Sequence, residues 1–311
     1  MYYYRCIMTD VVVRIRYNYF WGGFDPTITS LNFIFSNFKY IIVDDDSYDI
    51  LVLSVFHRDK ELINIKPNSL VILFVGESEI FVNTFLQETS IIPHILFGFP
   101  VKNAKLNNTI QIFYPLWILE NYDLVTNREL LDEINNKNRN IRNKKALLVC
   151  SHDREGQRTL ISDIVNKKFS VDYGGDFRNN IPKIPDGYDK KLEILERYTF
   201  NICPENHFQE YYNTEKLLHA CLAGCIPIYS GYLGEIERLF FNIERIIYLG
   251  DLSADCQYAL SEYLENLSDQ MIINEINKPI FRTENISYLI QHRNNVIDFF
   301  NKQIQTLLKS N

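Results

Sequence analysis

One stretch of the sequence, residues 198 to 231, constrains the fold more than any other part of the chain. It opens with an apolar run, Tyr198 to Cys203, that predicts a buried strand. After a polar loop, the apolar residues from 217 to 222 recur with helical spacing, so a helix is expected from near Asn213. A glycine ends that helix, and Cys225 to Tyr229 predicts a second strand. The stretch therefore predicts a strand, loop, helix and strand in succession, the repeating unit of α/β proteins.

The start of this helix is a predicted anion site. The first amides of a helix lack partners within it, and the positive end of the helix dipole lies there too. Both features would face the polar loop that follows the first strand, and they suit a phosphate group.

Length and composition predict a globular chain with two domains. The 311 residues exceed the size at which one hydrophobic core stops growing, and 46% hydrophobic residues are ample for packed cores. A net charge of −7 argues against a general nucleic-acid-binding protein, which needs a basic face. The six cysteines include no C-x-x-C pair, which favours reduced thiols in a core over a metal site.

Two further patterns bear on location and domain boundaries. No run reaches the roughly 18 apolar residues that span a bilayer, and the start lacks the apolar centre of a signal peptide. We therefore expect a soluble chain, cytoplasmic or peripheral to a membrane face. The charged, asparagine-rich segment Asn127 to Lys145 is the candidate linker. It divides the chain into a first domain (1–140), a second domain (141–285) and a C-terminal helix (286–311).

A run of three carboxylates, Asp44 to Asp46, follows an apolar segment and has two interpretations. A D-x-D sequence after a strand is the motif with which one large class of glycosyltransferases binds a divalent ion and a diphosphate. The other interpretation, which we favour, is a solvated turn between two elements, because cations near Lys216 would already supply the charge that a metal provides.

The central stretch resembles the donor-binding motif of the α-1,3-fucosyltransferases, glycosyltransferase family 10. That motif runs approximately F-N-x-x-F-E-N, then Y-x-T-E-K, and later G-x-x-P-I-Y. The matching segments here are Phe200-Asn201, Glu205-Asn206, Tyr212 to Lys216 and Gly224 to Tyr229. Two positions depart from the pattern. Pro204 stands where the family has an aromatic residue, and Asn213 where it has a small apolar one, which puts the shape of the sugar pocket in question more than nucleotide binding.

The resemblance implies a fold and a set of site residues. The fold is of the GT-B type, an α/β architecture with two Rossmann-like domains facing across a cleft. The first domain would hold the acceptor and the second the donor, GDP-fucose. The implied donor-binding residues are Arg158, Asn206, Tyr212, Glu215 and Lys216. Glu77 matches the glutamate of the family's aromatic-x-G-E-N segment and is implied as the general base.

The resemblance also implies the reaction: L-fucose moves from GDP-fucose to a sugar hydroxyl, the 3-OH of GlcNAc or glucose, with inversion at the anomeric carbon. Arg158 and Lys216 would neutralise the departing diphosphate, Glu215 would meet the ribose hydroxyls, and no metal or other cofactor is expected. The partners are then GDP-fucose and an oligosaccharide or glycoconjugate acceptor. Animal and plant members are anchored in the Golgi, so a Golgi-lumen location would apply only to a chain from which an anchor was removed.

Two alternatives remain beside this interpretation and the metal-dependent one. The chain could use another nucleotide sugar in the same fold, since Pro204 alters the pocket. It could also be a catalytically silent glycan-binding homologue that retains the fold without the reaction.

Overall fold

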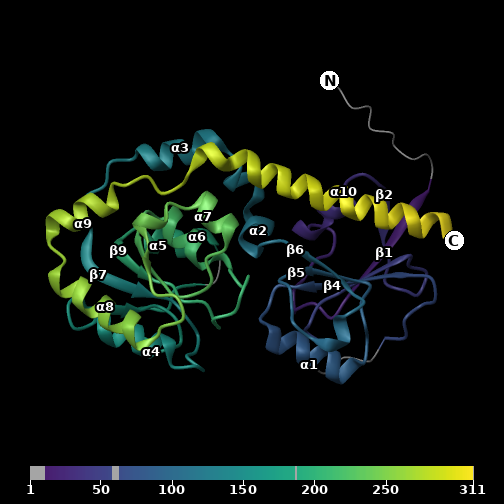
Figure 1. The fold of residues 1–311 in the computed structure, drawn as a ribbon, viewed down its shortest axis with the longest axis horizontal. Helices are drawn as coiled ribbons and strands as arrows, with labels where there is room; N and C mark the ends of the chain where they lie inside the picture. Colours follow the sequence, from purple (N-terminus) through teal and green to yellow (C-terminus); the bar gives the residue numbers. More distant parts are fainter. Residues whose placement is uncertain (1–10, 58–62, 186–187, 311) are drawn as a thin grey trace. The chain divides into compact units, whose positions relative to one another are not determined.

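A computed structural model describes residues 11–57, 63–185 and 188–310. The chain forms two compact units (Figure 1). The first contains the residues up to Glu120 together with Tyr288 and all that follow, and the second contains Asn121–Ser287. The first unit is thus built from both ends of the sequence.

The described part of the first unit is organised around a six-stranded, fully parallel sheet with the strand order β2-β1-β3-β4-β5-β6. Its central strands β3, β4 and β5 are buried at every position, whereas the edge strands β2 and β6 contain exposed residues and no fully buried ones. Continuous apolar runs are the pattern of parallel strands covered on both faces. The strands are β1 (Val12–Asn18), β2 (Lys39–Ile42), β3 (Ile50–Leu53), β4 (Leu70–Val75), β5 (Ile95–Gly98) and β6 (Ile110–Phe113).

Helical segments connect and cover this sheet. The 3₁₀ turns are η1 (Ser30–Phe35) and η2 (Ala104–Leu106), and the α-helices are α1 (Glu79–Thr89), α2 (Leu116–Val125) and α10 (Ile286–Ser310). The last helix packs on the first unit through aromatic side chains. Phe300 lies edge-on to Phe97 with ring centroids 5.4 Å apart, and Arg293 lies over the ring of Phe33 at 4.1 Å. These contacts explain why most of α10 belongs to the unit that starts the chain.

The second unit has a five-stranded parallel sheet within its described residues, in the order β11-β10-β9-β7-β8. The strands are β7 (Asn143–Leu148), β8 (Val171–Tyr173), β9 (Tyr198–Ile202), β10 (Ile226–Tyr229) and β11 (Ile247–Tyr248). The α-helices are α3 (Arg128–Asn136), α4 (Gln157–Val165), α5 (Tyr188–Leu195), α6 (Glu215–Leu222), α7 (Glu235–Phe240), α8 (Ala254–Asn266) and α9 (Asp269–Ile276); η3 (Ile243–Arg245) and η4 (Thr283–Asn285) are 3₁₀ turns.

Helices cover both faces of the second sheet. Alternate residues of one strand point to opposite faces, and in β7 Leu148 joins a core with Ile161 of α4 and Leu264 of α8. Its neighbour Leu147 joins a different core, with Leu195 of α5. The result is a sheet between two helical layers, so the ends of its strands are left as the open rim where ligands bind in such folds.

The central stretch folds as the sequence predicts. Strand β9 forms within the predicted strand Tyr198 to Cys203, α6 begins close to Asn213, and β10 follows it. Gly224 ends the helix with a φ of +70°, a left-handed conformation that glycine adopts without strain.

Two segments differ from the structure that their sequence suggests. The apolar residues of Thr27 to Tyr40 recur with the spacing of a helix, but only η1 forms there, and Lys39 already pairs with Val12 in the sheet. Pairing with β1 outweighs the helical pattern in this segment. The predicted linker Asn127 to Lys145 instead contains α3, whose first turn is capped by the Asn127 side chain accepting from the Leu130 amide at 3.1 Å.

The unit boundary also differs from the predicted division at residues 140 and 141. The units divide after Glu120, beside a kink of α2 at Asn121. Helix α3 belongs to the second unit because its side chains bond the segment before α10: Asn135 Oδ1 accepts from the Phe281 amide at 2.9 Å, and Thr283 donates to Asp132 at 2.6 Å. The C-terminal helix, predicted as a separate part (286–311), is therefore split between the units: its first two residues belong to the second unit and the residues from Tyr288 onward to the first.

Candidate functional site

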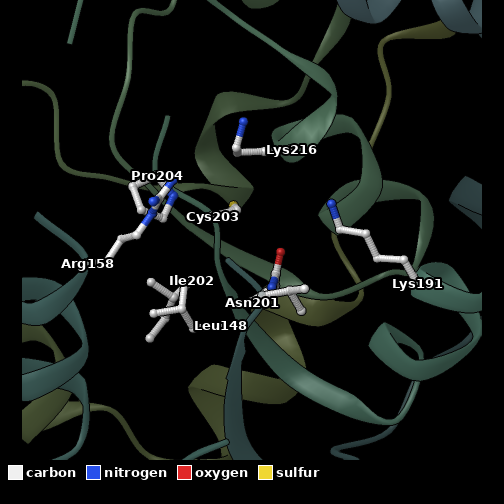
Figure 2. Close-up of a pocket in the computed structure, with 9 residues that line it drawn as sticks. Leu148, Arg158, Lys191, Asn201, Ile202, Cys203, Pro204 and Lys216 are labelled. Carbon is white, nitrogen blue, oxygen red and sulfur yellow. The ribbon is translucent and has the colours of Figure 1, made fainter. Parts of the chain in front are cut away.

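A pocket opens at the carboxyl ends of β7 and β9 in the second unit (Figure 2). Three cationic side chains line it, Arg158 from α4, Lys191 from α5 and Lys216 from α6. The other lining residues are Leu148, Val149, Asn201, Ile202, Cys203 and Pro204. An anion that enters this pocket would meet positive charge from three different helices.

Arg158 is fixed in the wall of this pocket. Its backbone amide donates to Asp153 at 3.1 Å, and the same carboxylate accepts from the Thr159 amide at 2.8 Å, which caps the start of α4. The guanidinium donates to the carbonyl of His152 and, at 2.6 Å, to Asn206 Oδ1. The side chain is only 6% exposed, so its direction is set by the protein before any ligand binds.

Lys216 is held by Glu205, a carboxylate that is 2% exposed. The ammonium donates to Glu205 Oε2 at 3.1 Å and to the Thr214 hydroxyl at 2.8 Å. Burial acts to lower the pKa of Lys216, but the Glu205 and Glu215 carboxylates outweigh that effect and raise it. Lys216 therefore carries its charge throughout the physiological range.

Glu205 also changes the predicted anion site at the start of α6. Its Oε1 accepts from the Thr214 amide at 2.8 Å, and its Oε2 accepts from the Thr214 hydroxyl at 2.7 Å. The anion at this helix start is thus the protein's own carboxylate, which the helix dipole favours. The Thr214 amide, which was predicted to be available to a ligand, thus already has a partner. The positive charge that a ligand would meet here is that of Lys216.

Glu215 stands between two lysines in the first turn of α6. Its Oε1 lies 3.9 Å from Nζ of Lys216 and 3.9 Å from Nζ of Lys191. Burial acts to raise the pKa of Glu215, but the two ammonium groups prevail and lower it to about 2. An ionised carboxylate can only accept hydrogen bonds, so it suits a ligand that presents hydroxyl groups.

Asn206 and Tyr212 continue the wall from Arg158. Asn206 Nδ2 donates to the Tyr212 hydroxyl at 3.5 Å, while its oxygen accepts from the guanidinium. Tyr212 is 1% exposed, so it supports the Asn206 side chain from inside the protein. The structure thus brings together all five predicted donor-site residues in one region of the second unit.

Glu77 belongs to the first unit, two residues after the end of β4 and two residues before α1 begins. It is half-buried at the carboxyl end of a central strand, the rim at which parallel sheets bind ligands. The next residue, Ser78, has extended backbone as the N-cap of α1, which separates the glutamate from the helix proper.

The three carboxylates Asp44 to Asp46 form the exposed turn that we favoured over a D-x-D motif. Asp46 pairs with Arg16 at 2.6 Å, and Asp45 accepts from the Ser47 amide at 2.8 Å. Within residues 11–57, 63–185 and 188–310, no group of three or more histidine, cysteine or acidic side chains is arranged to hold a metal ion. The five cysteines in those ranges are free thiols.

Comparison with known proteins adds to this geometry. No family model matches the chain. It is 27% identical over 290 residues to a putative fucosyltransferase, R654, of Acanthamoeba polyphaga mimivirus, which covers 88% of this chain and 44% of that protein. A shorter segment of 88 residues is 36% identical to the α-(1,3)-fucosyltransferase FucT of Helicobacter pylori, covering 28% of this chain and 17% of that one. The chain thus spans less than half the length of the curated relatives it matches.

The fold agrees with these sequence matches. A crystal structure of an α1,3-fucosyltransferase with GDP-fucose superposes with a TM-score of 0.64, covering 93% of this chain and 92% of the other at 16% identity. A second, of an α1,3-fucosyltransferase with GDP, gives a TM-score of 0.61 over 94% and 92% at the same identity. The chain is therefore similar in sequence to fucosyltransferases and similar in fold to α1,3-fucosyltransferases. The predicted GT-B fold with two Rossmann-like units is confirmed.

Three residues at or beside the pocket were not assigned a role from the sequence: Pro204, Glu205 and Lys191. Pro204, where the fucosyltransferase motif has an aromatic residue, lines the pocket beside Arg158 (Figure 2). Glu205 was visible in the Glu205-Asn206 pair but was given no role. Lys191 has no motif around it, and only the fold brings it to the pocket.

Among the residues that the structure describes, none of the helices combines the length and the apolar composition of a membrane span.

Proposed function

We propose that the chain is an inverting glycosyltransferase that moves L-fucose from GDP-fucose to a hydroxyl of an oligosaccharide acceptor, the 3-OH of GlcNAc or glucose. The observation that supports this most is the pocket in which Arg158 and Lys216 lie together, beside Asn206 and Glu215, in a GT-B unit. We also propose that the protein acts in the cytoplasm or at a membrane face.

Two tasks are divided between the units. Glu77 takes the proton of the acceptor hydroxyl as that oxygen forms its bond to the anomeric carbon of fucose. The bond from that carbon to the diphosphate breaks, and GDP leaves with the electron pair. Arg158 and Lys216 neutralise the charge that develops on the diphosphate, and Glu215 accepts hydrogen bonds from the ribose. Cations held in advance provide the stabilisation that a divalent ion provides elsewhere, so we expect transfer to continue in the presence of a chelator.

The donor is tested by thermal unfolding with GDP, UDP and dTDP. A ligand at 100 times its dissociation constant adds about 2.7 kcal/mol to the free energy of unfolding, which is easily measured. Stabilisation by GDP alone supports the proposal. Stabilisation by UDP or dTDP in its place would assign the chain to a transferase of another nucleotide sugar.

The reaction is tested with labelled GDP-fucose and a panel of N-acetyllactosamine, lacto-N-biose and lipid-linked acceptors. Glu77→Gln should lower kcat by about 10²- to 10⁴-fold while the affinity for GDP stays the same, because the general base does not contact the nucleotide. Glu79→Gln, in the first turn of α1, is the control and should retain activity. GDP binding without transfer to any acceptor would favour a silent glycan-binding homologue.

A further inference from the structure

Lys191 is the one cation lining the described pocket for which the sequence gave no role. It lies on α5, and Figure 2 places it across the pocket from Arg158, with Lys216 between them in the view. Within the described ranges its ammonium has one charged partner, Glu215, at 3.9 Å, a distance beyond a hydrogen bond. The group is therefore directed at the pocket without a close partner of its own.

The other two cations are bound more fully. Lys216 donates to Glu205 and Thr214 at 3.1 and 2.8 Å, and Arg158 donates to Asn206 at 2.6 Å. Glu215 lies equally far from both lysines, so it is shared between them. Arg158 also lies beside Asp153, and Lys216 beside Glu205, so Lys191 is the cation of the three whose nearest carboxylate lies beyond hydrogen-bond distance.

The weak pairing of Lys191 costs free energy in the empty protein. Burial lowers the pKa of Lys191, and the neighbouring Lys216 charge lowers it further, although Glu215 acts in the opposite direction. A half-buried ammonium with an under-used donor set is stabilised when an anion arrives, because each charge-assisted hydrogen bond to it then forms in a site with little water.

We propose that Lys191 is a third phosphate-binding cation of this pocket, whose ammonium donates to the diphosphate of the bound nucleotide. The proposal rests on the function given above and adds a residue to it. Arg158, Lys216 and Lys191 then approach the diphosphate from α4, α6 and α5, and the third lysine shares the negative charge that grows as the sugar departs. Glu215, relieved of part of its pairing with Lys191, keeps its acceptor oxygens for the ribose hydroxyls.

A second interpretation makes Lys191 a positioning residue that only orients Glu215. The two interpretations differ in which part of the nucleotide depends on the lysine. A phosphate contact affects ligands that carry phosphates, whereas an orienting role affects the ribose and so every nucleoside alike.

The experiment compares Lys191→Gln and Lys191→Met with the wild type in calorimetric titrations against GDP, guanosine and inorganic pyrophosphate. Lys191→Met keeps the apolar stem of the lysine, so a loss of affinity in both variants cannot be due to poor packing of the glutamine. We expect both variants to bind GDP and pyrophosphate about 10- to 100-fold more weakly, the effect of one hydrogen bond to a charged group. Affinity for guanosine should be unchanged, and Lys191→Arg should restore most of the GDP affinity.

The matched control is Lys190→Gln, which removes the same charge from an exposed position next to Lys191. It should alter GDP affinity by less than about twofold, since exposed charges are screened. Unchanged GDP affinity in both Lys191 variants, or an equal loss for guanosine and GDP, would overturn the proposal.

Pyrophosphate separates this inference from the proposed function. Binding of pyrophosphate that depends on Lys191, in a wild-type protein that ignores GDP, would support the third cation and reject the GDP-sugar transferase. Failure of the wild type to bind either ligand would reject both.

Discussion

Glu205 holds the lysine of the donor pocket and the start of α6 at the same time. Its two oxygens accept from the Thr214 amide, the Thr214 hydroxyl and the Lys216 ammonium at 2.7 to 3.1 Å. A carboxylate that is 2% exposed has given up nearly all of its water, so these bonds are what keeps it in place. Through this one set of contacts Glu205 both stabilises the protein and orients the Lys216 ammonium toward the pocket.

Glu205→Gln should therefore damage both stability and ligand binding. The amide cannot balance the Lys216 charge, and breaking a buried pair by removing one partner costs roughly 3 kcal/mol. We expect the free energy of unfolding in urea to fall by about that amount and the affinity for GDP to weaken, because the lysine loses its fixed direction. Glu196→Gln, an exposed position, should change neither quantity. A variant as stable as the wild type would contradict the role given to Glu205.

Helix α6 also carries a buried histidine that makes the second unit sensitive to acid. His219 is 6% exposed on the face of α6 that packs into the protein. Burial, followed by the nearby Lys191 charge, lowers the pKa of His219 to about 4. The unfolded chain binds a proton near pH 6.5, whereas the folded protein resists it until about pH 4.

The sign of the pH effect follows from this difference. Between pH 6.5 and 4 the unfolded state holds the extra proton, so the free energy of unfolding falls as the pH is lowered. The contribution of His219 reaches about 3 kcal/mol, at roughly 1.4 kcal/mol for each pKa unit. Urea unfolding of the wild type and His219→Gln at pH 7.5 and pH 4.5 measures it. The stability lost between the two pH values should be clearly smaller in the variant, and an equal loss in both proteins would contradict the prediction.

At the scale of the whole molecule, the first unit depends on a helix from the far end of the sequence. Phe300 of α10 is fully buried and meets Phe97 of β5 edge-on. We expect Phe300→Ala to cost roughly 3–5 kcal/mol. The loss should be confined to one unit: hydrogen exchange should accelerate in β4 and β5 and stay unchanged in β9 and β10. Ile290→Ala, an exposed position of the same helix, is the control. Equal acceleration in both sheets would contradict this division.

The sequence predicted the elements around residues 198 to 231 because apolar runs, a loop and a helix-ending glycine all indicated the same structure. It failed where contacts distant in the sequence decide the outcome. Helix α3 forms in an asparagine-rich segment whose Asn135 is bonded 146 residues away, at Phe281. Glycine is required at position 175 because a Cβ there would lie 2.0 Å from the Cys150 carbonyl oxygen, a close approach that no sequence pattern shows.

The site was predictable to a similar degree. A motif identified Lys216 and Asn206, and the structure brings both into one wall. The spacing of residues in the sequence could not show that the Glu205 carboxylate binds the start of α6. The loop between Glu205 and α6 has no periodic pattern from which its path could be predicted. Lys191 reaches the pocket from a separate helix, which only the packing of α5 beside α6 determines.

Because α10 returns to the first unit, that unit cannot be completed until the residues after Ser287 have been synthesised. Residues 121–287 can close their core as soon as they emerge, while the earlier sheet still waits for the side chains that will cover Phe97. Until translation reaches Phe300, that apolar surface is open to chaperones and to other nascent chains. A ribosome stalled in this interval would carry one mature lobe and one incomplete lobe on the same polypeptide.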